Sequence, residues 1–96
     1  MDILVTYDVN TLTPEGRRRL RRVAKVCEGF GQRVQESVFE CSVNDSQKEL
    51  LMTRLHKVIE PTEDSLRIYY LRGSRKDCVE AFGLDRYINF KEPLIL

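Results

Sequence analysis

The N-terminal segment from Ile3 to Val9 is mostly apolar and carries one carboxylate, Asp8, near its end. Its β-branched and aromatic residues favour a strand that is buried in a sheet. A carboxylate within such a strand is costly to desolvate unless a partner group or a metal compensates for the lost water. An Asp at the end of a strand also commonly bonds to backbone amides two residues later, which Asn10 and Thr11 would allow. Asp8 is therefore either a turn residue or a functional carboxylate.

The length and composition are those of one small globular domain. The chain has 96 residues, of which 42% are hydrophobic and 32% are charged. This length suffices for one core but not for two independent ones. No segment approaches the roughly 18 apolar residues that are needed to cross a bilayer, and no secretion signal is visible at the N-terminus. We therefore expect a cytoplasmic protein with no role in a membrane.

The three cysteines argue against a zinc site and against a disulfide framework. Cys27, Cys41 and Cys78 are an odd number, lie far apart, and are accompanied by only one His. Cys27 and Cys41 fall on apolar positions of predicted elements. We interpret these two as small hydrophobic residues of the core, which is what free cysteines usually are.

A helix is predicted to follow the first strand. Thr13 is suited to the N-cap position, Pro14 to the first helical position, and Glu15 to the first turn. Glycines at positions 29 and 31 end the helix. Apolar residues recur at helical spacing and predict a buried stripe. This stripe consists of Leu20, Val23, Ala24 and Cys27.

Six basic residues crowd into positions 17 to 25 of the same helix, although the net charge of the chain is only +1. They are Arg17, Arg18, Arg19, Arg21, Arg22 and Lys25. On a helical wheel Arg18, Arg22 and Lys25 point away from the apolar stripe, and the other three flank it. Such a cluster attracts phosphate. A basic helix face can equally be no more than a solvated surface.

The middle of the chain predicts further strands and a second helix. The segment 32–43 is strand-like, but its apolar phase shifts between Val34 and Phe39, so we expect a bulge or bend near residues 36–37. The sequence Ser46-Gln47-Lys48-Glu49 matches a capping box that opens a helix, and Pro61 closes it. Alternation from Leu66 to Leu71 indicates another strand.

This order of elements predicts an α+β fold, a ferredoxin-like two-layer sandwich in the order βαββαβ, with residues 1–96 as a single domain. After Gly73 the chain is expected to turn through residues 74–76. The tail, residues 78–96, is too apolar to remain in water. We expect it to dock as an additional C-terminal edge strand on its own sheet or on a partner's.

Four segments together resemble the family of the small CRISPR-associated adaptation protein, the partner of the CRISPR integrase, which is of endoribonuclease type. The resemblance covers residues 2–72, and the stretch from Gly29 to Cys41 is its most specific part. The other segments are Val5 to Val9, Arg17 to Lys25 and Asp64 to Tyr69.

The resemblance implies a homodimer in which Asp8 of each protomer faces its twin across the two-fold axis. A divalent metal, Mg²⁺ or Mn²⁺, would lie between the two carboxylates. The resemblance also makes Tyr7, Arg33 and Phe39 candidate catalytic residues beside Asp8. By their alternation with apolar neighbours, Tyr7 and Phe39 are equally well suited to the core.

Two compatible functions follow from these expectations. The first is a metal-dependent phosphodiesterase that cleaves RNA or DNA, in which paired Asp8 residues hold Mg²⁺ and Arg33 assists electrostatically. No clear general base is present, so turnover should be slow. The second is a dimeric adaptor without chemistry. It would clamp duplex DNA through the basic helices and hold integrase subunits apart during CRISPR spacer acquisition.

A third class of function shares the fold: a ferredoxin-like module that binds single-stranded RNA, or a regulatory module, without catalysis. Residues 29–31 resemble the basic-glycine-aromatic signature of RNA-recognition strands. They sit at a helix end, however, and lack the alternating aromatic residues of that motif. Fold class alone does not separate the three functions.

Overall fold

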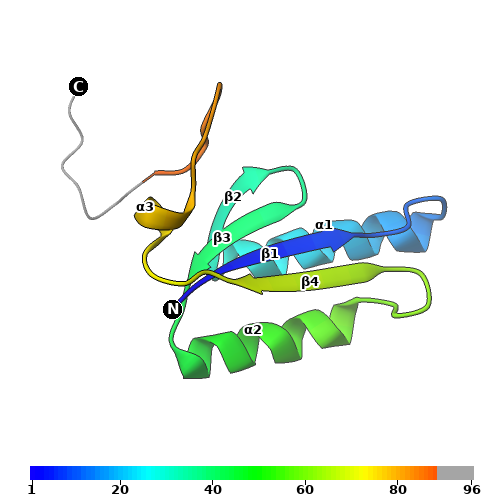
Figure 1. Ribbon diagram of the computed structural model, residues 1–96. Helices are drawn as coiled ribbons and strands as arrows, with labels where there is room; N and C mark the ends of the chain where they lie inside the picture. The colour runs from blue at the N-terminus through cyan, green and yellow to red at the C-terminus, as the bar shows by residue number, and fades with distance from the viewer. Residues whose placement is uncertain (89–96) are drawn as a thin grey trace.

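The computed structural model of the protein describes residues 1–88, which form a four-stranded antiparallel sheet with two long helices on one of its faces (Figure 1). The strands lie in the order β2-β3-β1-β4. This arrangement confirms the predicted ferredoxin-like α+β fold. In chain order the elements are β1 (Asp2–Asp8), α1 (Pro14–Glu28), β2 (Gly31–Gln35), β3 (Val38–Ser42), α2 (Asp45–Val58), β4 (Ser65–Tyr70) and α3 (Arg75–Cys78).

The core lies between the sheet and the two long helices. Every second residue of β1 faces the helices, so Ile3, Val5 and Tyr7 are buried. Leu66 and Ile68 of β4 pair with Tyr7 and Val5 and pack against the same core. Complete burial of one such side chain stabilises the fold by about 1.5 to 3 kcal/mol. The other buried apolar residues are Val9, Val23, Ala24, Cys27, Phe39, Cys41, Val43, Leu51, Leu55 and Val58.

Helix α1 begins as predicted. The side chain of Thr13 accepts a hydrogen bond of 3.1 Å from the backbone N–H of Gly16, and Pro14 occupies the first turn. The helix ends at Glu28, with Gly29 as its C-cap. Of the predicted apolar stripe, Leu20 is half-buried and the other members are buried.

The predicted start of α2 at Ser46 is wrong by two residues. The N-cap is Asn44, whose side chain accepts from the Gln47 N–H at 2.8 Å, while the Gln47 side chain accepts from the Asn44 N–H at 2.9 Å. The pair Asn44 and Gln47 and the predicted pair Ser46 and Glu49 both have the spacing of a capping box. The backbone decides between them, because the Val43 N–H donates to the Met1 carbonyl at 2.9 Å and so holds the chain extended up to Asn44.

The strand-like segment 32–43 forms a hairpin of two short strands, as its phase shift predicts. Turn residues 36–37 join β2 to β3. The pairing register shifts between Arg33 and Gln35, slightly before the position near residues 36–37 where the sequence predicts an irregularity.

Gly31 allows β2 to pack closely on β3. A Cβ atom at this position would collide with Sγ of Cys41 and with the carbonyl oxygen of Glu40. Burial raises the pKa of Cys41 to about 11 and the pKa of Cys27 to about 12. Both thiols therefore stay protonated and inert near neutral pH, which agrees with the interpretation of these cysteines as core residues.

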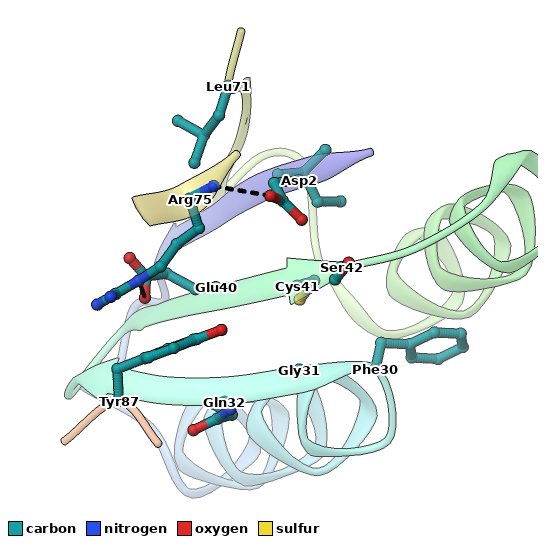
Figure 2. A pocket seen from close by; sticks show the side chains of 11 residues that line it. Asp2, Phe30, Gly31, Gln32, Glu40, Cys41, Ser42, Leu71, Arg75 and Tyr87 are labelled. Carbon is teal, nitrogen blue, oxygen red and sulfur yellow. Dashed lines mark hydrogen bonds and ion pairs between the residues drawn. The ribbon is translucent and has the colours of Figure 1, made fainter. Parts of the chain in front are cut away.

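Beyond β4 the chain turns back over the end of the sheet that carries the N-terminus (Figure 1). The predicted turn through residues 74–76 is instead the start of a short helix, α3. The Arg75 N–H donates to Oδ2 of Asp2 at 2.8 Å, and Nε of Arg75 donates to Oε2 of Glu40 at 3.1 Å (Figure 2). The ion pair compensates for the burial of Glu40, whose side chain is 6% exposed.

The described part of the tail lies on its own chain. Gln32 of β2 and the backbone of Ile88 exchange two hydrogen bonds, of 2.7 and 2.9 Å. The Tyr87 ring covers the Arg75 guanidinium at 3.6 Å, over a hollow of about 180 Å³ (Figure 2). No strand occurs within residues 71–88, and residues 89–96, where the predicted edge strand would continue, lie outside the described residues. Within residues 1–88 no helix has the length and hydropathy of a membrane span.

Candidate nucleic-acid and metal site

Asp8 lies at the end of β1, on the sheet face that the long helices leave open. It pairs with Ser65 of β4 and is exposed. The desolvation cost expected for this carboxylate is therefore absent in a single chain. Within residues 1–88 its side chain makes no hydrogen bond or ion pair. Asp8 thus presents a solvated carboxylate to anything that covers the open face.

The local turn that follows β1 is stabilised by Asn10 and not by Asp8. The Asn10 side chain accepts a hydrogen bond of 3.0 Å from the Leu12 N–H, as a turn-forming residue does. Of the two interpretations of Asp8, the turn residue is therefore wrong. No structural contact within the described chain accounts for the carboxylate.

Tyr7, Arg33 and Phe39 come together on the other face of the sheet, toward α1. The Tyr7 and Phe39 rings have centroids 6.3 Å apart, and the Arg33 guanidinium lies 5.2 Å from the Phe39 centroid. The Tyr7 hydroxyl donates a long hydrogen bond of 3.4 Å to the Glu36 carbonyl. Burial raises the pKa of Tyr7, and the neighbouring Arg33 only partly opposes this rise. The phenol is therefore neutral at physiological pH.

The predicted catalytic residues are thus divided between two faces of one sheet. Tyr7 and Asp8 are consecutive, so their side chains point in opposite directions. Phe39 is fully buried, at 0% exposure, and supports Arg33 from below. Asp8 and Arg33 are exposed, and the largely buried Tyr7 lines a hollow beside α1.

The six basic residues of α1 also differ in their surroundings. Arg17 donates to the Thr11 carbonyl at 3.2 Å, and Arg18 makes an exposed ion pair with Glu15 at 3.4 Å. Arg19 is the exception, with a side chain only 16% exposed. The remaining three are exposed and make no ion pair or hydrogen bond within residues 1–88; they are Arg21, Arg22 and Lys25.

Arg19 belongs to a buried network that the sequence analysis missed. The Asp64 side chain is fully buried and accepts from Arg19 Nε at 2.9 Å, from the Asn10 N–H at 3.1 Å and from the Glu60 N–H at 2.8 Å. Glu63 adds a second pair to Arg19 at 3.0 Å. The network ties the loop after Asp8 to α1 and to the loop before β4.

The electrostatics of this network favour an ionised Asp64. Burial by itself raises the pKa of the carboxyl, but the hydrogen bonds from Arg19, Glu60 and Asn10 outweigh it, so that the pKa lies below its ordinary value. Because the carboxylate already neutralises Arg19, this arginine is less available to an anion than the five other basic residues of α1 are. In the sequence, the one sign of a role for Asp64 is its position in the segment from Asp64 to Tyr69, one of the four segments that carry the family resemblance.

One chain does not complete a metal site. Within the described residues, no group of three or more His, Cys, Asp or Glu side chains could hold a metal ion. Asp8 is a hard oxygen ligand of the kind that Mg²⁺ and Mn²⁺ prefer, but it stands alone. The donor set fits a divalent cation only if a second chain supplies a second carboxylate.

Comparison with known proteins gives consistent matches along the chain. Residues 1–78 match the family described as "CRISPR associated protein Cas2". The chain is 54% identical over 96 residues, all of both chains, to "CRISPR-associated endoribonuclease Cas2 1" of Moorella thermoacetica. It is 47% identical to "CRISPR-associated endonuclease Cas2" of Halalkalibacterium halodurans, over 99% of each chain.

A solved structure agrees with the sequence matches. The crystal structure of Streptococcus pyogenes Cas2 at pH 6.5 superposes with a TM-score of 0.78 and is 52% identical in sequence. The match covers 86% of this chain and 100% of that one. Sequence and fold therefore lead to the same group of proteins.

Proposed function

The chain belongs to the CRISPR-associated protein Cas2 family, and from this premise we propose that it acts as a homodimer in CRISPR spacer acquisition. The dimer binds duplex DNA and bridges integrase subunits. It also carries a slow metal-dependent endonuclease activity on RNA or DNA. The observation that carries this proposal is the exposed Asp8 at the end of β1, whose side chain has no hydrogen-bond or ion-pair partner among residues 1–88.

A two-fold axis would turn one carboxylate into a metal site. Mg²⁺ prefers octahedral oxygen coordination that combines a few carboxylates with several waters. Two symmetry-related Asp8 residues would provide that number of carboxylates. When bound, Mg²⁺ or Mn²⁺ would stabilise charge on the scissile phosphate and activate water for its attack. Two close carboxylates without a cation repel each other, which favours protonation of one of them. Because a proton competes with the metal for the carboxylates, metal affinity should fall at acid pH.

The adaptor role needs surfaces for DNA and for protein. The exposed basic side chains of α1 supply charge for phosphate contacts. The tail, residues 78–96, supplies apolar surface for a partner, because Phe82 is 87% and Leu84 is 99% exposed even though the tail contacts its own chain nearby. We propose that the tail docks on a second subunit or on the integrase.

The test of the proposed activity is a cleavage assay on single-stranded RNA and on duplex DNA. Purified protein is incubated with Mg²⁺, with Mn²⁺ or with a chelator. Slow cleavage that requires the cation is expected. Duplex binding without cleavage under any condition would leave the adaptor role alone, and neither binding nor cleavage would refute the proposed function.

The protein is expected to be a dimer at micromolar concentration. The proposed metal site requires Asp8 from a second copy of the chain, and the exposed apolar tail offers surface that a second copy can cover. Multi-angle light scattering should give the mass of two 11.3 kDa chains. A monomer at this concentration would remove the basis of the metal argument.

Reversing two charges on α1 is expected to weaken duplex binding and its dependence on salt. Arg18 and Arg22 lie on the outer face, and each phosphate contact contributes about −0.9 to the logarithmic salt slope. The variant Arg18→Glu/Arg22→Glu should therefore lose roughly two such contacts per protomer engaged on DNA. Fluorescence anisotropy at several salt concentrations measures both quantities. Lys57→Glu on α2 is the control, and an unchanged slope in the α1 variant would show that this face is only solvated.

A further inference from the structure

A second hollow lies between α1 and the β2–β3 hairpin, on the face of the sheet opposite to Asp8. Its volume is about 520 Å³, within the range of about 300 to 1,000 Å³ that is typical of small-ligand sites. Tyr7 lines its sheet side, and Leu20 and Ala24 of α1 provide an apolar wall. We name this hollow the arginine cleft.

Three arginines from three separate parts of the chain line the arginine cleft. Arg21 comes from α1, Arg33 from β2 and Arg86 from the tail. Within residues 1–88 none of the three makes an ion pair, whereas Arg18, Arg19 and Arg75 all do. Arg33 interacts with the Tyr7 side chain and opposes the rise in its pKa. Like charges around one hollow repel each other. An anion between them would relieve this repulsion.

The Arg33 guanidinium is held ready for such an anion. It lies over the buried Phe39 ring, 5.2 Å from the centroid, and it also interacts with the Tyr7 side chain. These contacts restrict its position and leave N–H donors of the guanidinium available. The planar fork of a guanidinium matches the oxygen atoms of a phosphate in two parallel hydrogen bonds. The Tyr7 hydroxyl, which has one long hydrogen bond, adds a neutral donor close by.

The rest of the lining distinguishes between a bare anion and a larger ligand. Glu28 and Glu36 also line the cleft, and neither pairs with its arginines. Carboxylates next to a phosphate site would oppose a bare anion but accept hydrogen bonds from sugar hydroxyls or base amino groups. The apolar wall of Leu20 and Ala24 suits a sugar or a base.

We propose that the arginine cleft binds a nucleoside monophosphate, either free or as the terminal unit of a single strand. Arg21 and Arg33 contact the phosphate, and Glu28 and Glu36 accept from the nucleoside. This inference deepens the proposed function and rests on it for the class of ligand. It does not require metal at Asp8, which lies on the other face of the sheet.

The test is a nuclear magnetic resonance titration of the isotope-labelled full chain with adenosine 5′-monophosphate in the presence of a chelator. Shift changes should cluster at Tyr7, Leu20, Ala24 and Arg33. The exposed substitution Arg21→Gln should weaken binding about tenfold or more, since a hydrogen bond to a charged group is lost. Lys57→Gln on α2 should leave it unchanged. Arg33→Gln is a second variant, whose fold is checked by the same spectra.

Two further ligands complete the experiment. A 5′-phosphorylated trinucleotide that binds more tightly than the mononucleotide indicates a strand end, and the reverse order indicates a free nucleotide; both support the cleft. Equal affinity for inorganic phosphate would overturn recognition of a nucleoside. Shift changes elsewhere, or an unaffected Arg21→Gln variant, would overturn the site.

The outcomes separate this inference from the proposed function. Duplex binding and metal-dependent cleavage without any shift change on adding the mononucleotide would refute the arginine cleft alone. Nucleotide binding in chelator, by a protein that neither binds duplex DNA nor cleaves nucleic acid with metal, would refute the proposed function and leave the cleft supported.

Discussion

Asp8→Asn is expected to lower metal-dependent cleavage by about 100-fold or more. The substitution keeps the shape of the side chain but removes the negative charge, and in the proposed homodimer the two-fold axis would remove it twice at the same site. Because the Asp8 side chain is exposed and makes no hydrogen bond or ion pair within residues 1–88, the variant should fold as well as the wild type does. Initial rates on RNA and on duplex DNA, measured in parallel preparations, give the ratio.

A second measurement and a control make this result specific. Titration calorimetry with Mn²⁺ should show binding by the wild type and none by Asp8→Asn. Asp45→Asn replaces another exposed carboxylate, at the start of α2, and should retain both cleavage and binding. Equal cleavage by wild type and Asp8→Asn would assign the activity to a contaminant or to another site. Duplex binding should survive, because the basic face of α1 is untouched.

Asp64→Ala is expected to give the largest loss of stability. The fully buried carboxylate accepts hydrogen bonds from Arg19, Asn10 and Glu60, and its removal leaves these donors unpaired around a small cavity. The free energy of unfolding should fall by about 2 to 4 kcal/mol. For a domain of this size, that lowers the melting temperature by roughly 10 to 20 °C. Thermal unfolding at equal protein concentration measures the loss.

The same variant should change the dependence of stability on pH. The pKa of Asp64 in the folded protein lies below its ordinary value of 3.8, so its contribution to stability is complete above that value and is lost as the pH falls through the folded pKa. The difference in unfolding free energy between wild type and Asp64→Ala should therefore shrink in acid.

The matched control for Asp64→Ala is its neighbour in sequence. Glu63 pairs with the same arginine but is 45% exposed, so Glu63→Ala should cost less than about 1 kcal/mol. A similar loss in both variants would show that exposed charge at this loop, and not the buried network, stabilises the protein. If the difference in unfolding free energy between wild type and Asp64→Ala is the same at every pH, Asp64 is not ionised in the folded protein.

The order of elements and most of the core could be predicted from the sequence, because these depend on local periodicity. Alternation along β1 places Tyr7 toward the helices and Asp8 on the open face, and the cap at Thr13 lies where its residue type indicates. The start of α2 could not be predicted in this way, because two capping-box patterns overlap, one from Asn44 to Gln47 and one from Ser46 to Glu49. The backbone hydrogen bond from the Val43 N–H to the Met1 carbonyl selects Asn44 as the N-cap.

The sequence by itself determined the ferredoxin-like fold, the family and the choice of Asp8 as a candidate, because strand alternation, helix caps and motif spacing are properties of neighbouring residues. The exposure of Asp8 emerged only from the tertiary structure. Only the tertiary structure decided which arginines remain available. Arg19 is neutralised by Asp64, 45 positions away, and Arg21 and Arg33 meet Arg86 in one cleft. Contacts of this range depend on how the chain closes on itself, and no local pattern encodes them.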